Sequence, residues 1–363
     1  MNARPLAWSL LCAASLATSA PAQSAPPGPA KPPIRGITVS THGSGRDWGT
    51  AAIDRCFDDL AAVHANWVCI HPYARIHRSG RVTWDTFTSD APPAYLTRPI
   101  AEAHRRGLKV FVKPHLAYWG SPFRWRGEIT FDDATRWNRF FTHYRQWIVA
   151  VAAACSKADG FAVGTELDKT AVHTAQWRAI IRAVREVTRA PLTYAANWSD
   201  YQRIGFWDAL DIIGVQAYFP LADRRDAPDE LLRAGWRRVM EEVRTFAVRQ
   251  RRNVVFTELG YTNSFRAAIE PWASHSDGRD AEPFQRRLMA VALRAIEDEP
   301  RVEGAFLWKW FPPPRSTGRD FRIATPEMQR TIAEVWRHPA SPRPAAGATH
   351  RGATDRGATD RGR

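Results

Sequence analysis

The sequence predicts an α/β fold of the (β/α)8, or TIM-barrel, type, built as a single domain. Eight short apolar runs alternate along the chain with longer stretches of helical pattern. The runs are nearly continuous in β-branched and aromatic residues, as at 212–215, which suits parallel strands covered on both faces. A doubly wound open sheet is the alternative, but no Gly-rich phosphate loop follows the first expected strand.

Each expected element has a local signal. The strands are expected at 36–40, 67–71, 109–114, 160–166, 192–196, 212–217, 254–258 and 304–309. The helices are expected at 51–64, 98–106, 132–154, 175–188, 229–250 and 283–297, with a short one near 206–210. A last helix starts at Thr325, an N-cap residue followed by Pro326 at the first helical position. The barrel domain therefore spans 34–338, a length that TIM barrels reach as one unit.

The two ends of the chain differ from this pattern. Arg4, an apolar stretch over 6–17 and a small-residue site at 20–22 predict a signal peptide over 1–22, and hence a secreted or periplasmic protein. A flexible Pro-rich leader is expected over 23–33, and a disordered low-complexity tail over 339–363. No later segment is apolar over a membrane-spanning length.

Composition limits the class of partner. The formal net charge is +14, but the arginines are spread along helices, and no nucleic-acid-binding motif accompanies them. A solvated basic surface is favoured over a protein that binds anionic polymers of the envelope. The chain has 16 Trp and 17 Phe, which fill a core or offer platforms on which sugar rings stack.

The cysteines and the possible metal ligands give little indication of function. Cys12 lies in the expected signal peptide, and the three cysteines that remain cannot all pair. A bridge between Cys56 and Cys69 stays open at this point. No metal-ligand spacing and no Gly-x-Ser-x-Gly nucleophile motif is present, so neither a metal nor a cofactor is expected.

Two expected strands end in a glutamate. Glu166 and Glu258 each follow a threonine and precede a leucine, at the ends of the fourth and seventh strands. A carboxylate there is costly to desolvate, and the carboxyl ends of barrel strands hold the reactive groups. One carboxyl that donates a proton and one that attacks are the chemistry of glycoside hydrolysis.

The motifs around these glutamates resemble those of glycoside hydrolase family 113, in the large retaining clan A, whose characterised members are β-1,4-mannanases. The resemblance implies a retaining hydrolase of β-linked hexose polysaccharide or oligosaccharide, most specifically β-1,4-mannan, that acts by double displacement. It implies that Glu166 is the acid/base and Glu258 the nucleophile, with carboxyls ~5–5.5 Å apart. The similar segments are 112–115, 161–167, 192–198, 206–211, 213–220, 256–261, 271–272 and 304–310.

The resemblance also assigns substrate-binding residues. Tyr218, at the end of strand six, would hydrogen-bond the nucleophile, and Trp308 would form the floor beneath the sugar. A barrel-rim tyrosine and a packed barrel tryptophan are the structural alternatives. Asn197 and Trp198 follow strand five, where Asn197 is a candidate for sugar hydroxyls or a turn residue.

Further candidates lie after strand three. Lys113 and His115 close that strand, either as substrate ligands or in a salt bridge and a capped loop. Four aromatic residues follow in a long loop and are candidate sugar platforms, because such a loop otherwise exposes apolar surface. They are Tyr118, Trp119, Phe123 and Trp125.

One position departs from the clan. Many members have Asn immediately before the acid/base, where it contacts the sugar 2-hydroxyl, and here that position is Thr165. Asn197 or His115 would then take over the contact. The alternative function is a non-catalytic carbohydrate-binding barrel of the envelope, with its carboxylates far apart or paired with arginine. We expect a monomer with no nucleic-acid partner.

Overall fold

A computed structural model describes residues 32–337, apart from 42, 89, 274–275, 313–320 and 322. The expected signal peptide, the tail over 339–363 and all but the last two leader residues lie outside the described residues. These predictions therefore stay predictions.

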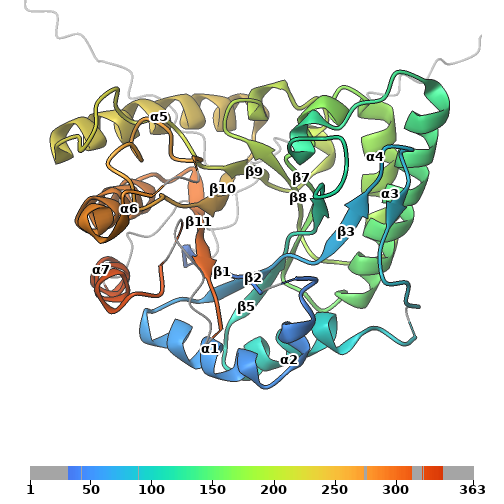
Figure 1. Cartoon of the computed structure of the whole chain (residues 1–363), viewed down its shortest axis with the longest axis horizontal. Helices are drawn as coiled ribbons and strands as arrows, with labels where there is room; N and C mark the ends of the chain where they lie inside the picture. The colour runs from blue at the N-terminus through green and yellow to red at the C-terminus, as the bar shows by residue number, and fades with distance from the viewer. Residues whose placement is uncertain are drawn as a thin grey trace, which may run out of the picture.

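Eight parallel strands close into a barrel in the order β1-β11-β10-β9-β8-β7-β5-β2 (Figure 1). Each of them overlaps one of the eight expected strands, so the TIM-barrel prediction is confirmed. Their bounds are Ile34–Val39 for β1, Trp67–Ile70 for β2, Lys109–Val112 for β5, Gly160–Thr165 for β7, Leu192–Asn197 for β8, Ile213–Gln216 for β9, Val254–Leu259 for β10 and Val302–Trp310 for β11.

In the described part of the chain, seven α-helices surround this barrel (Figure 1). They are α1 (Ala52–Ala62), α2 (Ala94–Arg105), α3 (Ala134–Ala154), α4 (Thr174–Val187), α5 (Asp229–Gln250), α6 (Glu282–Glu297) and α7 (Pro326–Trp336). Between β8 and β9 the described chain forms only the 3-10 turns Tyr201–Arg203 and Trp207–Ala209, the second of which is the expected short helix.

The helix starts show where sequence signals succeed and fail. The side chain of Thr325 accepts a hydrogen bond from the backbone N–H of Met328 at 3.3 Å, so the expected N-cap of α7 is confirmed. The expected start of α2 at residue 98 is wrong. Pro93 ends the preceding extended segment, and α2 begins at Ala94 with Pro99 in its interior rather than in its first turn.

Two further features were not fixed by the sequence. A small sheet of order β4-β3-β6 (Val82–Thr83, Tyr73–Ile76 and His115–Ala117) follows the ends of β2 and β5 and was not predicted. Cys56, Cys69 and Cys155 are buried free thiols, so the bridge left open between the first two is absent.

The barrel interior is filled by side chains below the mouth. Phe111 of β5 stacks on Phe306 of β11 with ring centroids 4.7 Å apart, and Cys69 of β2 belongs to the same cluster. Side chains two positions apart on a strand face the same side. The residues two positions beyond this cluster therefore point to the mouth, and they are His71, Lys113 and Trp308.

Candidate active site

All eight barrel strands bring a polar or aromatic residue to one mouth, at or just beyond their carboxyl ends. This is where a barrel of this type carries its chemistry. In the order of the chain, these residues are Ser40, His71, Lys113, Glu166, Asn197, Tyr218, Glu258 and Trp308.

Glu258 is held by a donor on each oxygen. Its residue is only 4% exposed. The ammonium of Lys113 donates to Oε1, and the hydroxyl of Tyr218 donates to Oε2 at 2.7 Å. Burial, followed by the charge of Glu258, raises the pKa of Tyr218 well above its usual value, so that its hydroxyl stays a donor. The expected contact between Tyr218 and the nucleophile candidate is present.

Local irregularity aims Glu258 at the mouth. The pairing of β10 with β9 shifts register between Phe256 and Glu258, and such a shift redirects the following side chain. Gly260 follows at a close approach, because a Cβ there would lie 2.8 Å from the carbonyl oxygen of Trp308. Glycine at this position therefore brings the ends of β10 and β11 together.

Lys113 also binds His115. The Lys113 ammonium lies 3.1 Å from Nε2 of His115, which must be neutral to accept this hydrogen bond. Burial and then the charges of Arg126 and Lys113 lower the pKa of His115 well below its usual value. Lys113 also forms the salt bridge expected in the structural alternative. Its partner is Glu258, inside the mouth. His115 lies in β6, beyond the end of β5 at Val112.

Aromatic rings border this cation. The ring of Trp308 stacks on His115 with centroids 5.9 Å apart, and Lys113 Nζ lies 5.1 Å from the Trp308 centroid. His71 packs against the same tryptophan at 5.3 Å, and its Nε2 lies 2.8 Å from Ser40 Oγ. Trp308 is only partly buried, so part of this indole remains accessible at the mouth.

Glu166 stands on a strained turn. Its φ of 50° lies in the left-handed region, which non-glycine residues rarely adopt. Its backbone N–H donates to Ala195 O at 2.9 Å, and the N–H of Leu167 donates to the hydroxyl of Tyr194 at 2.8 Å. Strain of this kind costs ~1–3 kcal/mol and persists where surrounding structure enforces it. Strand β8 therefore fixes the direction in which Glu166 points.

The surroundings of Glu166 favour its protonated form. Burial raises its pKa, and the negative charge of Glu258 adds to the increase. Arg126, Lys113 and the Gln216 amide act in the opposite direction, but the pKa stays above its usual value. Gln216 is itself fixed by Thr257, whose hydroxyl donates to its Oε1 at 2.8 Å. The two glutamates are thus electrostatically coupled across the mouth.

Arg126 is a member of the site that the sequence did not reveal. It begins the 3-10 turn Arg126–Glu128, and its Nη1 lies 3.6 Å from Oε2 of Glu166. Its guanidinium lies 5.9 Å from the ring centroid of Tyr118. The sequence offered one signal for Arg126: it is a charged residue among the aromatic residues of the loop, and such a charge needs a partner of opposite charge.

Asn197 lies beside an acidic cluster next to Glu166, formed by Asp168 and Asp200. Burial, then the charges of Asp200 and Glu166, raise the pKa of Asp168 to about 7, and a hydrogen bond from Asn197 opposes this increase. Asn197 therefore serves a neighbouring carboxyl in addition to any substrate. The Thr165 hydroxyl donates to Pro114 O at 3.0 Å, so it holds the end of β5.

The expected aromatic platforms are only partly assembled at the mouth. Trp198 stacks on the half-exposed Trp272 with centroids 5.4 Å apart. In the long loop, Trp119 is 53% exposed and packs beside Tyr73 at 5.7 Å. Phe123 instead packs edge-on against Phe131. Two exposed tryptophans thus remain as possible sugar platforms.

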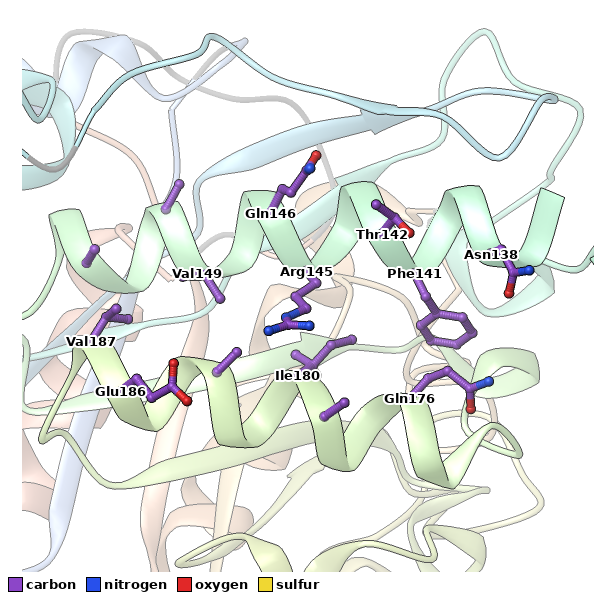
Figure 2. Close-up of a pocket in the computed structure, with 14 residues that line it drawn as sticks. Asn138, Phe141, Thr142, Arg145, Gln146, Val149, Gln176, Ile180, Glu186 and Val187 are labelled. Atoms are coloured by element: carbon purple, nitrogen blue, oxygen red, sulfur yellow. The ribbon is translucent and has the colours of Figure 1, made fainter. Parts of the chain in front are cut away.

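A separate cavity of about 890 Å³ lies outside the barrel, between α3 and α4. Figure 2 shows side chains such as Phe141, Arg145 and Ile180 lining it from the two helices. It contains none of the residues at the mouth, so its size does not make it the reaction site. Within the described residues, no cluster of three or more His, Cys, Asp or Glu could hold a metal ion, and no helix there could cross a membrane.

The comparison with protein families decides between the possible kinds of barrel. The model of glycoside hydrolase family 113 matches residues 37–316, which include all the mouth residues above. The chain belongs to glycoside hydrolase family 113. A sequence search of curated proteins finds no match.

Solved structures agree with the family assignment. This chain is 25% identical to a family 113 β-mannanase from Alicyclobacillus acidocaldarius in complex with ManMIm. The two structures match with a TM-score of 0.73, over 85% of this chain and 98% of that one. A family 113 β-1,4-mannanase complex gives 20% identity and the same TM-score, over 85% and 99%. A family 5 mannosidase from Rhizomucor miehei shares only the fold, at 9% identity and a TM-score of 0.61, over 85% and 93%.

Proposed function

We propose that this glycoside hydrolase cleaves β-1,4-linked mannan, or a related β-linked hexose chain, with retention of anomeric configuration. Glu258 is the nucleophile and Glu166 the acid/base. One observation carries the proposal: the two glutamates face one mouth in opposite surroundings. Glu258 accepts hydrogen bonds from Lys113 and Tyr218 on its two oxygens, whereas burial holds the pKa of Glu166 above its usual value.

The reaction uses this difference twice. Glu166 gives its proton to the glycosidic oxygen while Glu258 attacks the anomeric carbon, and a glycosyl-enzyme ester forms. The ester removes the negative charge of Glu258, which had raised the pKa of Glu166. The pKa of Glu166 then falls, so the same group becomes the base that deprotonates water. Hydrolysis of the ester restores the starting state.

The choice of sugar rests on the family and on the neighbours. The solved β-mannanases of the family share the fold over almost their entire length. Trp308 offers an apolar surface beside Glu258, and Trp119 and Trp272 offer exposed rings on which further sugar units can stack. These features support a chain of several sugar units as the substrate.

One observation favours the alternative of sugar binding without cleavage. That alternative predicts a carboxylate paired with arginine, and Arg126 lies 3.6 Å from Glu166. The distance exceeds a hydrogen bond, and the pKa of Glu166 stays raised despite the charge of Arg126. Turnover therefore distinguishes the two functions.

The test is incubation of the purified protein with defined β-1,4-manno-oligosaccharides, with products followed by mass spectrometry and anomeric NMR. We expect shorter oligosaccharides whose new reducing ends appear first as the β-anomer. Binding without any product would favour the non-catalytic barrel, and an initial α-anomer would contradict double displacement.

We also propose that the chain is exported and acts as a monomer. The support for export is the signal-like pattern over 1–22 in the sequence. N-terminal sequencing of the mature protein should start near residue 23, and light scattering should give the mass of one chain.

A further inference from the structure

Arg126 is a buried cation whose hydrogen-bonding capacity is unused. The residue is 8% exposed, and its side chain makes no hydrogen bond within the part of the chain that the structure describes. Its Nε is buried without a partner. Its one ion pair there, with Glu166 at 3.6 Å, is too long for a hydrogen bond. Its two Nη groups are not fully buried and also make no hydrogen bond within the described residues, so the guanidinium presents free donors to a ligand.

Catalysis requires a protonated Glu166, which leaves Arg126 with even fewer partners. The proposed acid must hold a proton when substrate binds, and a protonated Glu166 no longer offers Arg126 a negative charge. Glu258 does not replace it, because within the described residues Glu258 pairs with Lys113 and makes no ion pair with Arg126. In the catalytic state, Arg126 is therefore a buried cation with no ion-pair partner among the described residues.

The charges that act on the two buried histidines at the mouth are positive as well. The charges that act most strongly on the buried His71 are those of Lys113, Lys309 and Arg126, and each lowers its pKa. His115 experiences the same three cations. Its Nδ1, which carries the proton when Nε2 accepts from Lys113, is a further buried donor without a partner. Two buried donors without acceptors, the Arg126 guanidinium and the His115 Nδ1–H, suit an anionic ligand better than a neutral one.

We propose that Arg126 binds the carboxylate of an acidic sugar unit next to the bond that is cleaved, so that the preferred substrate is a β-linked glycan containing hexuronate. The planar guanidinium matches a carboxylate with two parallel hydrogen bonds. Arg126 contacts the acid/base, which protonates the glycosidic oxygen, so the bound sugar flanks that oxygen. This inference rests on the proposed role of Glu166.

Binding of this kind would also assist the acid. The positive charge of Arg126 lowers the pKa of Glu166 in the free protein. A substrate carboxylate that pairs with Arg126 offsets this charge and adds a negative one, and both effects favour the protonated acid. An acidic substrate thus prepares its own proton donor.

The test uses two tetrasaccharides that differ only at C6: β-1,4-linked mannose and β-1,4-linked mannuronate. Binding by calorimetry and kcat/KM are measured at about 0.15 M salt, where exposed charges are largely screened. We expect the wild-type protein to bind the acidic tetrasaccharide roughly 10- to 100-fold more tightly, the range of a hydrogen bond to a charged group. Arg126→Gln should abolish this preference, and Arg126→Lys should retain part of it.

The control is Arg124→Gln, which removes an exposed arginine from the same loop and should keep the preference. If Arg126→Gln does not fold, Arg126→Lys carries the comparison. Equal or tighter binding of the neutral tetrasaccharide by the wild type, a preference unchanged in the Arg126 variants, or binding of neither sugar would overturn the inference. A preference for the acidic sugar without turnover of either would uphold it and would instead contradict the proposed hydrolysis.

Discussion

The ends of β7 and β10 carry the same three residues, Thr-Glu-Leu, yet their glutamates have opposite surroundings. Glu258 is 4% exposed, and both its oxygens accept hydrogen bonds from side chains. The side chain of Glu166 is 20% exposed, stands on a strained backbone and has a cation at 3.6 Å. Local sequence is therefore not what separates an acid from a nucleophile. The neighbouring strand ends impose the difference through Lys113 and Tyr218, and the loop after β6 adds Arg126.

The largest effect should come from removing the better-bound carboxylate. Glu258→Gln keeps the size of the side chain but cannot form the glycosyl-enzyme ester, so kcat should fall by at least about 10⁴-fold. Steady-state kinetics on an oligosaccharide measures this loss. Glu186→Gln, which changes an exposed glutamate on α4, should leave kcat unchanged. Comparable losses of kcat in the two variants would contradict the assignment of Glu258 as the nucleophile.

Glu166→Gln should slow substrates to different extents, according to how much their leaving groups need a proton. Without the acid, hydrolysis of an unactivated oligosaccharide should slow by about 10²- to 10⁴-fold, the usual contribution of a positioned acid. An aryl glycoside with a good leaving group needs no proton, so its glycosylation step should slow much less. Comparing the two substrates checks the role directly. An equal loss on both would show that Glu166 does not act as the acid.

Tyr218→Phe tests the hydrogen bond from a tyrosine hydroxyl that Glu258 accepts. The variant removes the 2.7 Å hydrogen bond to Oε2 and leaves Lys113 in place. Loss of a hydrogen bond to a charged group costs ~1.5–3 kcal/mol, so kcat/KM should fall roughly 10- to 100-fold. Tyr144→Phe, which removes a buried hydroxyl of α3 that donates to Val163 O at 2.8 Å, is the matched control. A Tyr218→Phe enzyme with wild-type kinetics would show that the contact is not used in the reaction.

The pH profile should give the smallest effect and the most direct view of Glu166. The pKa of Glu166 is raised by burial and by Glu258, and it is lowered by Arg126, Lys113 and Gln216. The acid form is lost as pH rises through this pKa, so kcat/KM should fall on the alkaline side above the usual glutamate range. Arg126→Gln removes a lowering charge, and the alkaline limb on a neutral substrate should move to higher pH. A shift to lower pH would contradict the account.

The fold, and the position of most candidate residues at one mouth, followed from the strand pattern, whereas the roles proposed for them came from the family resemblance. Phe111 and Phe306 fill the barrel, and the residues two positions further on, Lys113 and Trp308, must then face the mouth. Arg126 had no such periodicity to place it, because it lies in a long loop after β6. Its burial comes from tertiary packing with Tyr118 and Glu166. For the same reason the small sheet that includes β6 was missed.

The most direct test of the central claim is to trap the intermediate. A 2-deoxy-2-fluoro-mannoside with a reactive leaving group should inactivate the enzyme, because fluorine slows hydrolysis of the ester more than its formation. Peptide mass spectrometry should then find one glycosyl unit on Glu258 and none on Glu166. A label on Glu166, or cleavage that yields the α-anomer with no covalent adduct, would contradict the roles given to the two strand ends.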